Sequence, residues 1–156
     1  MARTGRMKAA EAEQGVNVSG IALGTPILTL QGALPVEHLT PGDRIITRNG
    51  ARRLVAITPL PPAGVVRLSA STLGVEQPQE DIIVGADTPV KVTDWRARAF
   101  GGTDHAMVEA RWLCDGEFIR REPAGAHRLF RLEFDQPEVI YAGGIEIGIA
   151  PQVAEV

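Results

Sequence analysis

Glycine and proline interrupt this 156-residue chain at short intervals, and this spacing limits the fold more than any other feature. The 17 glycines and 11 prolines leave only short runs between them, and these runs are rich in β-branched residues. Glycine and proline favour turns and end regular elements, so short runs between them predict strands joined by tight turns. The expected fold class is mainly β, with short antiparallel strands and one short helix.

The clearest local signal is Asn49-Gly50, which lies between two strand-like runs. Both residues tolerate positive φ, so the pair predicts a hairpin closed by a type I′ turn. The expected strands cover residues 26–30, 44–48, 52–57, 65–68, 82–84, 89–92, 118–119, 129–134 and 138–141, with a turn at 143–144 before a last strand.

The expected helix covers residues 106–113, where Trp112 and Leu113 fall near one helical face. Asp115-Gly116 would end it. A large aromatic residue on the only helix predicts that Trp112 is buried, with Cys114 beside it; Trp95 is expected to be buried as well.

Composition argues against several classes of function. The formal net charge is −3, whereas proteins that bind nucleic acid usually carry a concentrated basic face. Residues 1–15 contain no apolar run of the kind found in secretory signals, and no stretch approaches a membrane-spanning helix. We therefore expect a cytoplasmic protein with neither a nucleic-acid nor a membrane partner.

Few residues suggest a metal or cofactor site. The single cysteine, Cys114, excludes a disulfide within the chain and a cysteine-based zinc site. The histidines, His38, His105 and His127, have no partners at ligand spacing, although a shift in register would bring His127 toward the centre described below. Asp87 is expected to bond its own turn, with binding of a water as the alternative. No cofactor and no metal are expected.

Several blocks, taken in order, resemble a bacterial Hint (Hedgehog/intein) domain. The first comprises GTPILT at residues 24–29, PVEHL at 35–39 and PGDRI at 41–45. Similar blocks follow at residues 90–98, 108–116, 119–121, 130–135 and 138–144. The resemblance covers residues 19–151, and the expected domain has these limits, with a flexible tail over 1–18 and a tail over 152–156.

The resemblance implies a horseshoe-shaped β fold that rearranges a peptide bond at its own N-terminal edge. In that family a Cys or Ser attacks the preceding carbonyl and converts an amide to a thioester or ester. This chemistry requires a nucleophile, a group that protonates the leaving nitrogen (usually a His) and donors for the oxyanion.

The family's catalytic positions carry other residues in this chain. Gly20 occupies the position of the nucleophile and Thr88 that of the histidine in the second block, while Arg131 and Pro137 stand where later histidines occur. We therefore expect no catalytic, cofactor-binding or metal-binding residue and no enzymatic activity. The expected function is that of a degenerate Hint domain retained as a structural or binding module, with a protein or peptide as its possible partner.

Two other functions stay open at this stage. In the first, the hydroxyl of Ser19 or Thr25 performs an N–O acyl shift, and the chain cleaves itself near Ser19. Such cleavage would release only residues 1–18, which counts against it. In the second, the chain is a hydrolase with a site that the sequence does not reveal.

Overall fold

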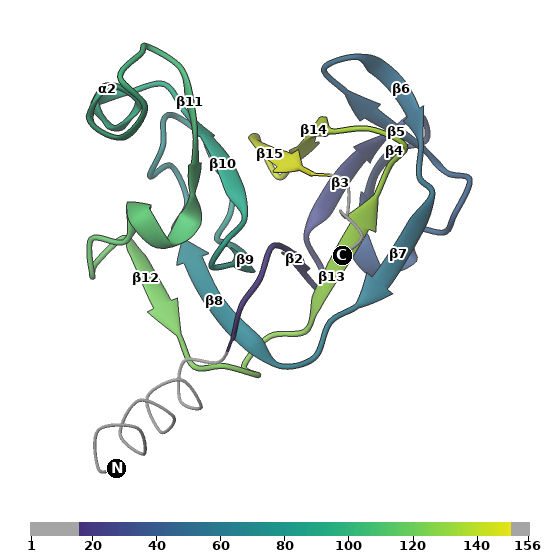
Figure 1. The fold of residues 1–156 in the computed structure, drawn as a ribbon, viewed down its shortest axis with the longest axis horizontal. Coiled ribbons are helices and arrows are strands. Elements are labelled where there is room, and N and C mark those ends of the chain that lie inside the picture. The colour runs from purple at the N-terminus through teal and green to yellow at the C-terminus, as the bar shows by residue number, and fades with distance from the viewer. Residues whose placement is uncertain (1–15, 151–156) are drawn as a thin grey trace, which may run out of the picture.

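Short strands form two curved sheets that together resemble a horseshoe (Figure 1). The structure, a computed structural model, describes residues 16–150; the C-terminal tail and most of the N-terminal tail fall outside this range. The expected mainly β class is confirmed. The first paired strand begins at Val16, within the expected tail, and the domain limits stay a prediction.

The first sheet has seven strands. In order they are β1 (Val16–Asn17), β8 (Ala63–Leu68), β9 (Ile82–Gly85), β2 (Ile21–Ala22), β13 (Leu129–Glu133) and β7 (Ala56–Pro59), with β12 (Ile119–Glu122) also paired to β8. Only the β1–β8 pair is parallel.

The second sheet has eight antiparallel strands. In order they are β11 (Ala106–Glu109), β10 (Pro89–Val92), β15 (Ile145–Ile149), β14 (Glu138–Ala142), β3 (Pro26–Thr29), β5 (Arg44–Thr47) and β6 (Gly50–Arg53), with β4 (Gly32–Pro35) paired to β3. Two 3-10 turns, η1 (Val36–His38) and η2 (Ala110–Leu113), complete the connections together with helix α2 (Trp95–Gly101).

The expected hairpin is confirmed, but its turn is of another kind. Thr47 pairs with Gly50, so Arg48 and Asn49 form the turn. Gly50 has a φ of 90°, whereas Asn49 is not in the positive-φ region that a type I′ turn requires. The Thr47 hydroxyl donates to the Gly50 carbonyl (2.8 Å) and accepts from the Asn49 amide (3.0 Å), which stabilises this alternative turn.

The position of the expected helix is wrong. Residues 106–109 form β11, which pairs with β10, and residues 110–113 form the 3-10 turn η2. The α-helix of the described residues is α2, which begins after Asp94 and ends before Gly102. The Asp94 carboxylate accepts the Arg96 amide (2.9 Å) as an N-cap, and Gly102 takes the left-handed conformation that ends many helices.

The core consists of aliphatic side chains rather than tryptophan. One large cluster spans both sheets and includes Ile27, Ile45, Ile140 and Ile147, and none of these four side chains is accessible to solvent. Trp95 and Trp112, expected to be buried, are 68% and 58% exposed. Each carries a guanidinium group over its ring instead, that of Arg96 at 5.2 Å and that of Arg111 at 4.8 Å from the ring centroid.

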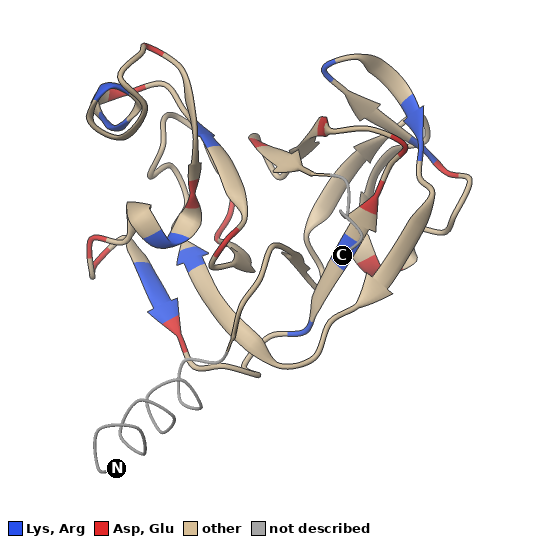
Figure 2. Cartoon of the chain, viewed as in Figure 1, with Lys and Arg blue, Asp and Glu red and all other residues tan. Residues whose placement is uncertain are grey.

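Charges of both signs are spread over both halves of the fold (Figure 2). Arginines mark β12 and the β5–β6 hairpin, and acidic residues lie on the neighbouring strands and loops. Over residues 16–150 the structure contains no helix with the length and apolar character that crossing a membrane requires.

The burial of these residues predicts which substitutions destabilise the fold. Ile140→Ala should lower the free energy of unfolding by about 2–5 kcal/mol, because it leaves a cavity in the core. Trp112→Ala should lower it by at most about 1 kcal/mol, because it removes an exposed ring and one cation–π contact. Urea denaturation of both variants tests this; a loss for Trp112→Ala as large as that for Ile140→Ala would contradict the assigned core.

Candidate functional site

Gly20 and Thr88, the residues at the family's nucleophile and histidine positions, lie in direct contact. Gly20 comes just before β2, and Thr88 lies in the turn between β9 and β10. The Gly20 amide donates to the Thr88 hydroxyl oxygen (2.9 Å), and the same hydroxyl donates to the Gly20 carbonyl (3.0 Å). Thr88 is completely buried. The positions that the family resemblance assigns to the nucleophile and to the histidine of the second block therefore form one site.

Backbone hydrogen bonds hold the chain on both sides of Ser19. The Asp87 amide donates to the Val18 carbonyl (2.9 Å), and the Gly85 amide donates to the Gly20 carbonyl (2.9 Å). A Cβ on Gly85 would overlap the Val18 carbonyl oxygen, so only glycine permits this close approach. The carbonyl groups of Val18 and Gly20 are thus both bound by the backbone around Thr88.

The position of the nucleophile has little free space. A Cβ added to Gly20 would lie 2.8 Å from Cδ1 of Leu60 and 3.2 Å from the carbonyl oxygen of Phe130. The leucine methyl group can move aside, but the backbone carbonyl belongs to β13 and cannot move easily. A side chain at this position would therefore require Leu60 and β13 to shift.

The carboxylate of Asp87 is the least satisfied polar group at the site. Its Oδ1 atom is buried and has no hydrogen-bond partner among the described residues, so the expected bond to its own turn is not formed through this atom. The nearest cation is Arg111, whose Nε lies 3.6 Å away. Arg111 binds Glu109 more closely, with 2.8 Å between Nη2 and Oε2.

The other two histidine positions do not join the site. Arg131 lies in β13 opposite Thr58, and Pro137 precedes β14. Within residues 16–150, no hydrogen bond or ion pair links either residue to Gly20 or Thr88. The site therefore consists of Gly20, Thr88 and the backbone around them.

His127 belongs to a separate network of charges, and the idea that it reaches the centre is wrong. Its Nε2 donates to Oε1 of Glu122 (2.9 Å), whose other oxygen accepts from Nε of Arg67 (2.9 Å). Nη1 of Arg67 lies 3.3 Å from Oδ2 of Asp81. His127 and Asp81 also line a pocket of about 470 Å³ together with Thr25. The pairing of β8 with β12 brings these residues together, and the sequence alone does not reveal that register.

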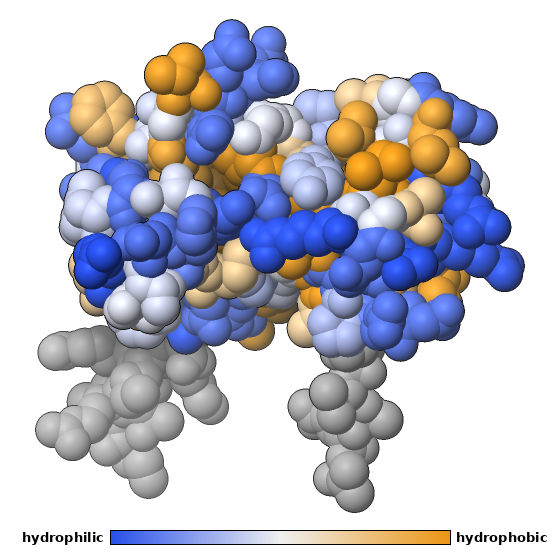
Figure 3. Space-filling view, turned by 90° about the horizontal axis from the view of Figure 1, so that it is seen from above, coloured by the Kyte–Doolittle hydropathy of each residue, from blue (hydrophilic) through white to orange (hydrophobic). Residues whose placement is uncertain are grey.

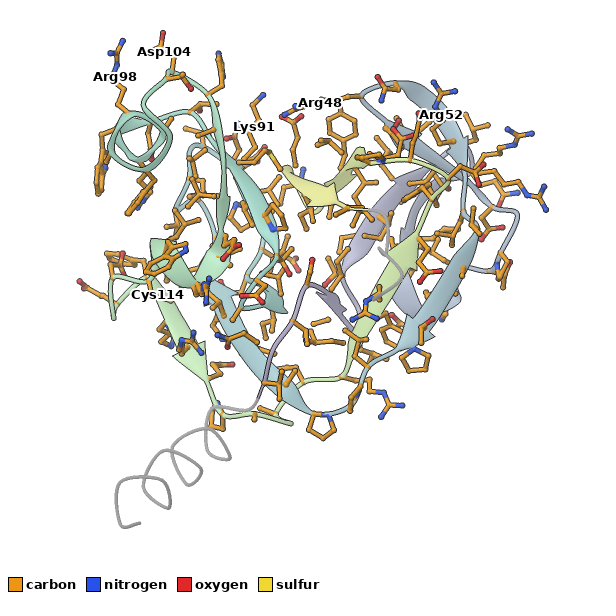
Figure 4. All side chains as sticks on the ribbon, in the orientation of Figure 1. Arg48, Arg52, Lys91, Arg98, Asp104 and Cys114 are labelled. Atoms are coloured by element: carbon orange, nitrogen blue, oxygen red, sulfur yellow. The ribbon has the colours of Figure 1, made fainter. Side chains whose placement is uncertain are left out.

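Cys114 is half-buried rather than buried. Burial raises the pKa of its thiol, which keeps the reactive thiolate scarce at neutral pH. Figure 4 places it below helix α2, at the outer side of this half of the molecule. Residues 16–150 contain no group of three or more His, Cys, Asp or Glu side chains placed to hold a metal ion.

Comparisons with known proteins agree with this architecture. The Hint domain family matches residues 20–148, and the chain belongs to that family. A search of curated proteins finds no match.

Solved structures show the same fold at low sequence identity. The bacterial intein-like domain from Clostridium thermocellum is 19% identical, with a TM-score of 0.63, and the match covers 85% of this chain and 99% of that one. A DnaB intein from Synechocystis sp. PCC 6803 is 12% identical, with a TM-score of 0.60, and the match covers 87% and 100% of the two chains. This similarity shows the fold alone.

The contact between Gly20 and Thr88 leads to a direct test. Thr88→Val keeps the side-chain shape but leaves the buried Gly20 amide without an acceptor, so the free energy of unfolding should fall by about 1–3 kcal/mol. Thr88→Ser retains the hydroxyl and should lower the free energy of unfolding by clearly less. Urea denaturation of the wild type and the two variants measures these free energies. Equal losses of stability in Thr88→Val and Thr88→Ser would show that the hydroxyl does not stabilise the fold.

The network around Glu122 predicts a dependence of stability on pH. The Arg67 guanidinium, followed by the His127 imidazole, lowers the pKa of Glu122 to about 2. Because the pKa in the unfolded chain is about 4.3, this carboxylate stabilises the fold above pH ~5, and the contribution disappears as the pH falls toward 2.

The expected contribution is about 1–3 kcal/mol, and Glu122→Gln should remove it. Urea denaturation between pH 3 and pH 7 tests this, with Glu117→Gln at an exposed position as the control. The same pH dependence in Glu122→Gln and the wild type would contradict the assignment.

Proposed function

We propose that this chain is a Hint domain that does not cleave itself and acts as a structural or binding module. The observation that carries the proposal is the pair of hydrogen bonds between the Thr88 hydroxyl and the amide and carbonyl groups of Gly20. The proposal includes the protein or peptide partner and the cytoplasmic location that the sequence predicts.

The first step of the family's chemistry lacks its nucleophile. Attack on the Ser19 carbonyl requires a thiol or hydroxyl on residue 20, and glycine offers none. Leu60 and the Phe130 carbonyl also lie close to Gly20, which supports the view that glycine at this position serves close packing.

Protonation of the leaving nitrogen is also unsupported. That nitrogen is the amide of Gly20, and the group beside it at 2.9 Å is the Thr88 hydroxyl. An imidazolium at this place would release a proton near neutral pH, whereas an aliphatic hydroxyl does not. The hydroxyl oxygen instead accepts a hydrogen bond from this amide, which satisfies the N–H of the intact peptide bond.

One observation favours the alternative of self-cleavage at Ser19. An N–O acyl shift there would place negative charge on the Val18 carbonyl oxygen, and the Asp87 amide already donates to this oxygen. Gly85, however, packs closely against the same Val18 carbonyl oxygen, and this packing holds the carbonyl in place. The Asp87 amide also completes a strand-like hydrogen bond, and this role requires no chemistry.

Intact-mass spectrometry of the full chain tests the proposal. After several days at neutral pH with dithiothreitol or hydroxylamine, the mass should be unchanged, because no ester or thioester forms. A fragment that arises from cleavage at Val18–Ser19 and disappears in Ser19→Ala would contradict the proposal. A fragment that disappears only in Thr25→Ala would place the activity at Thr25 and contradict it equally.

A further inference from the structure

The outer face of strands β3, β5 and β6 carries apolar side chains that are partly exposed. Ile27 and Thr29 of β3, and Ile45 and Thr47 of β5, point into the core and are buried. Since side chains alternate along a strand, the residues between them point outward. Leu28 on this outer face is 39% exposed, and Leu30 just beyond it is 63% exposed.

The pairing of the strands places these side chains in one row. Thr29 pairs with Ile45, which places Leu28 beside Ile46. Leu28 pairs with Ala33 of β4, and Ile46 pairs with Ala51 of β6. The row therefore runs across four strands. In the view of Figure 3, apolar side chains lie among hydrophilic ones on the half of the molecule that contains these strands, and also on the other half.

Two arginines lie beside this row, each two residues along its strand from a member of the row. Arg44 of β5 and Arg53 of β6 pair directly across the hairpin, and both are exposed. Like charges directly opposite each other on two strands repel and destabilise the pair. Within the described part of the chain, neither guanidinium has an ion-pair or hydrogen-bond partner.

The neighbouring arginines differ in this respect. Nε of Arg48 lies 2.8 Å from Oε1 of Glu146, which also binds Lys91, and Nε of Arg52 lies 3.6 Å from Oε2 of the buried Glu138. Figure 4 shows Arg48 and Lys91 approaching each other from the two halves of the fold. Two of the four arginines of the hairpin are thus paired with glutamates of this chain. Arg44 and Arg53 remain available to an external anion.

We propose that this outer face docks an acidic, apolar segment of a partner protein. We call it the β3–β6 face, and its residues are Leu28, Ala33, Arg44, Ile46, Ala51 and Arg53. A carboxylate of the partner lies between the two guanidinium groups, where it relieves their repulsion and makes charge-assisted hydrogen bonds. Apolar side chains of the partner cover the row beside them. The inference is independent of whether the chain cleaves itself, because the face does not include Gly20 or Thr88.

Binding of peptides to the full chain tests this proposal. The probes are a set of capped synthetic octapeptides in which Glu or Asp alternates with Leu, Val or Ile, and a matched set with Lys in place of the acids. Titration followed by amide chemical shifts in ¹H–¹⁵N NMR spectra reports both affinity and location. We expect saturable shifts confined to β3–β6 with the acidic set and none with the Lys set.

Matched variants identify the charges that are responsible. Arg44→Gln combined with Arg53→Gln should weaken binding by about tenfold or more, because both charged donors are lost. The double variant should keep the wild-type spectrum elsewhere, since it removes a repulsion. Arg128→Gln, at an exposed arginine on the other sheet, should leave the affinity unchanged.

Several outcomes would overturn the proposal. One is the absence of saturable shifts with every acidic peptide up to about 1 mM, the weak end of specific association. Others are equal binding of the Lys set and equal weakening by Arg128→Gln. Shifts at this face with anionic phosphatidylglycerol vesicles but not with peptides would assign it to a lipid surface. A dimer in sedimentation that is lost in the double variant would assign it to a second copy of the chain.

Discussion

The hydroxyl of Thr88 makes two hydrogen bonds to Gly20, one to each of the peptide groups on either side of its Cα, at the point where the chain passes from the first sheet to the second. Thr88 follows β9 of the first sheet and precedes β10 of the second, while Gly20 leads into β2. The amide of Gly20 is buried, and without this hydroxyl it would lack an acceptor. At the centre of the fold, the Thr88 hydroxyl and the backbone of Gly20 therefore satisfy each other's hydrogen bonds.

Packing around this pair is consistent with the same role. Gly20 permits Leu60 and the Phe130 carbonyl to approach, and Gly85 permits the Val18 carbonyl to do so. Larger side chains at either glycine would force the strands apart. The aliphatic core spans both sheets and includes none of the positions at which the family resemblance places catalytic residues.

Much of the fold could be predicted from the sequence because its strands are short β-branched runs between turn residues, as at residues 26–29 and 44–47. The helix was misplaced because Trp112 and Leu113 suggested a helical face, whereas pairing with β10 decided the conformation of residues 106–109. Asp94 and Gly102 were the capping signals for the true helix. The network around Glu122 could not be predicted, since it depends on contacts between residues as distant as Arg67 and Glu122.

Amide hydrogen exchange at Gly20 tests the central claim most directly. If the Thr88 hydroxyl closes the site, the Gly20 amide exchanges only when the whole protein unfolds, with the same protection as core amides such as those of Val84 and Ile140. In Thr88→Val the protection of the Gly20 amide should fall, while the protection of the core amides changes only with global stability. Rapid exchange of Gly20 in the wild-type protein, while the core amides stay protected, would show an open centre and contradict the account.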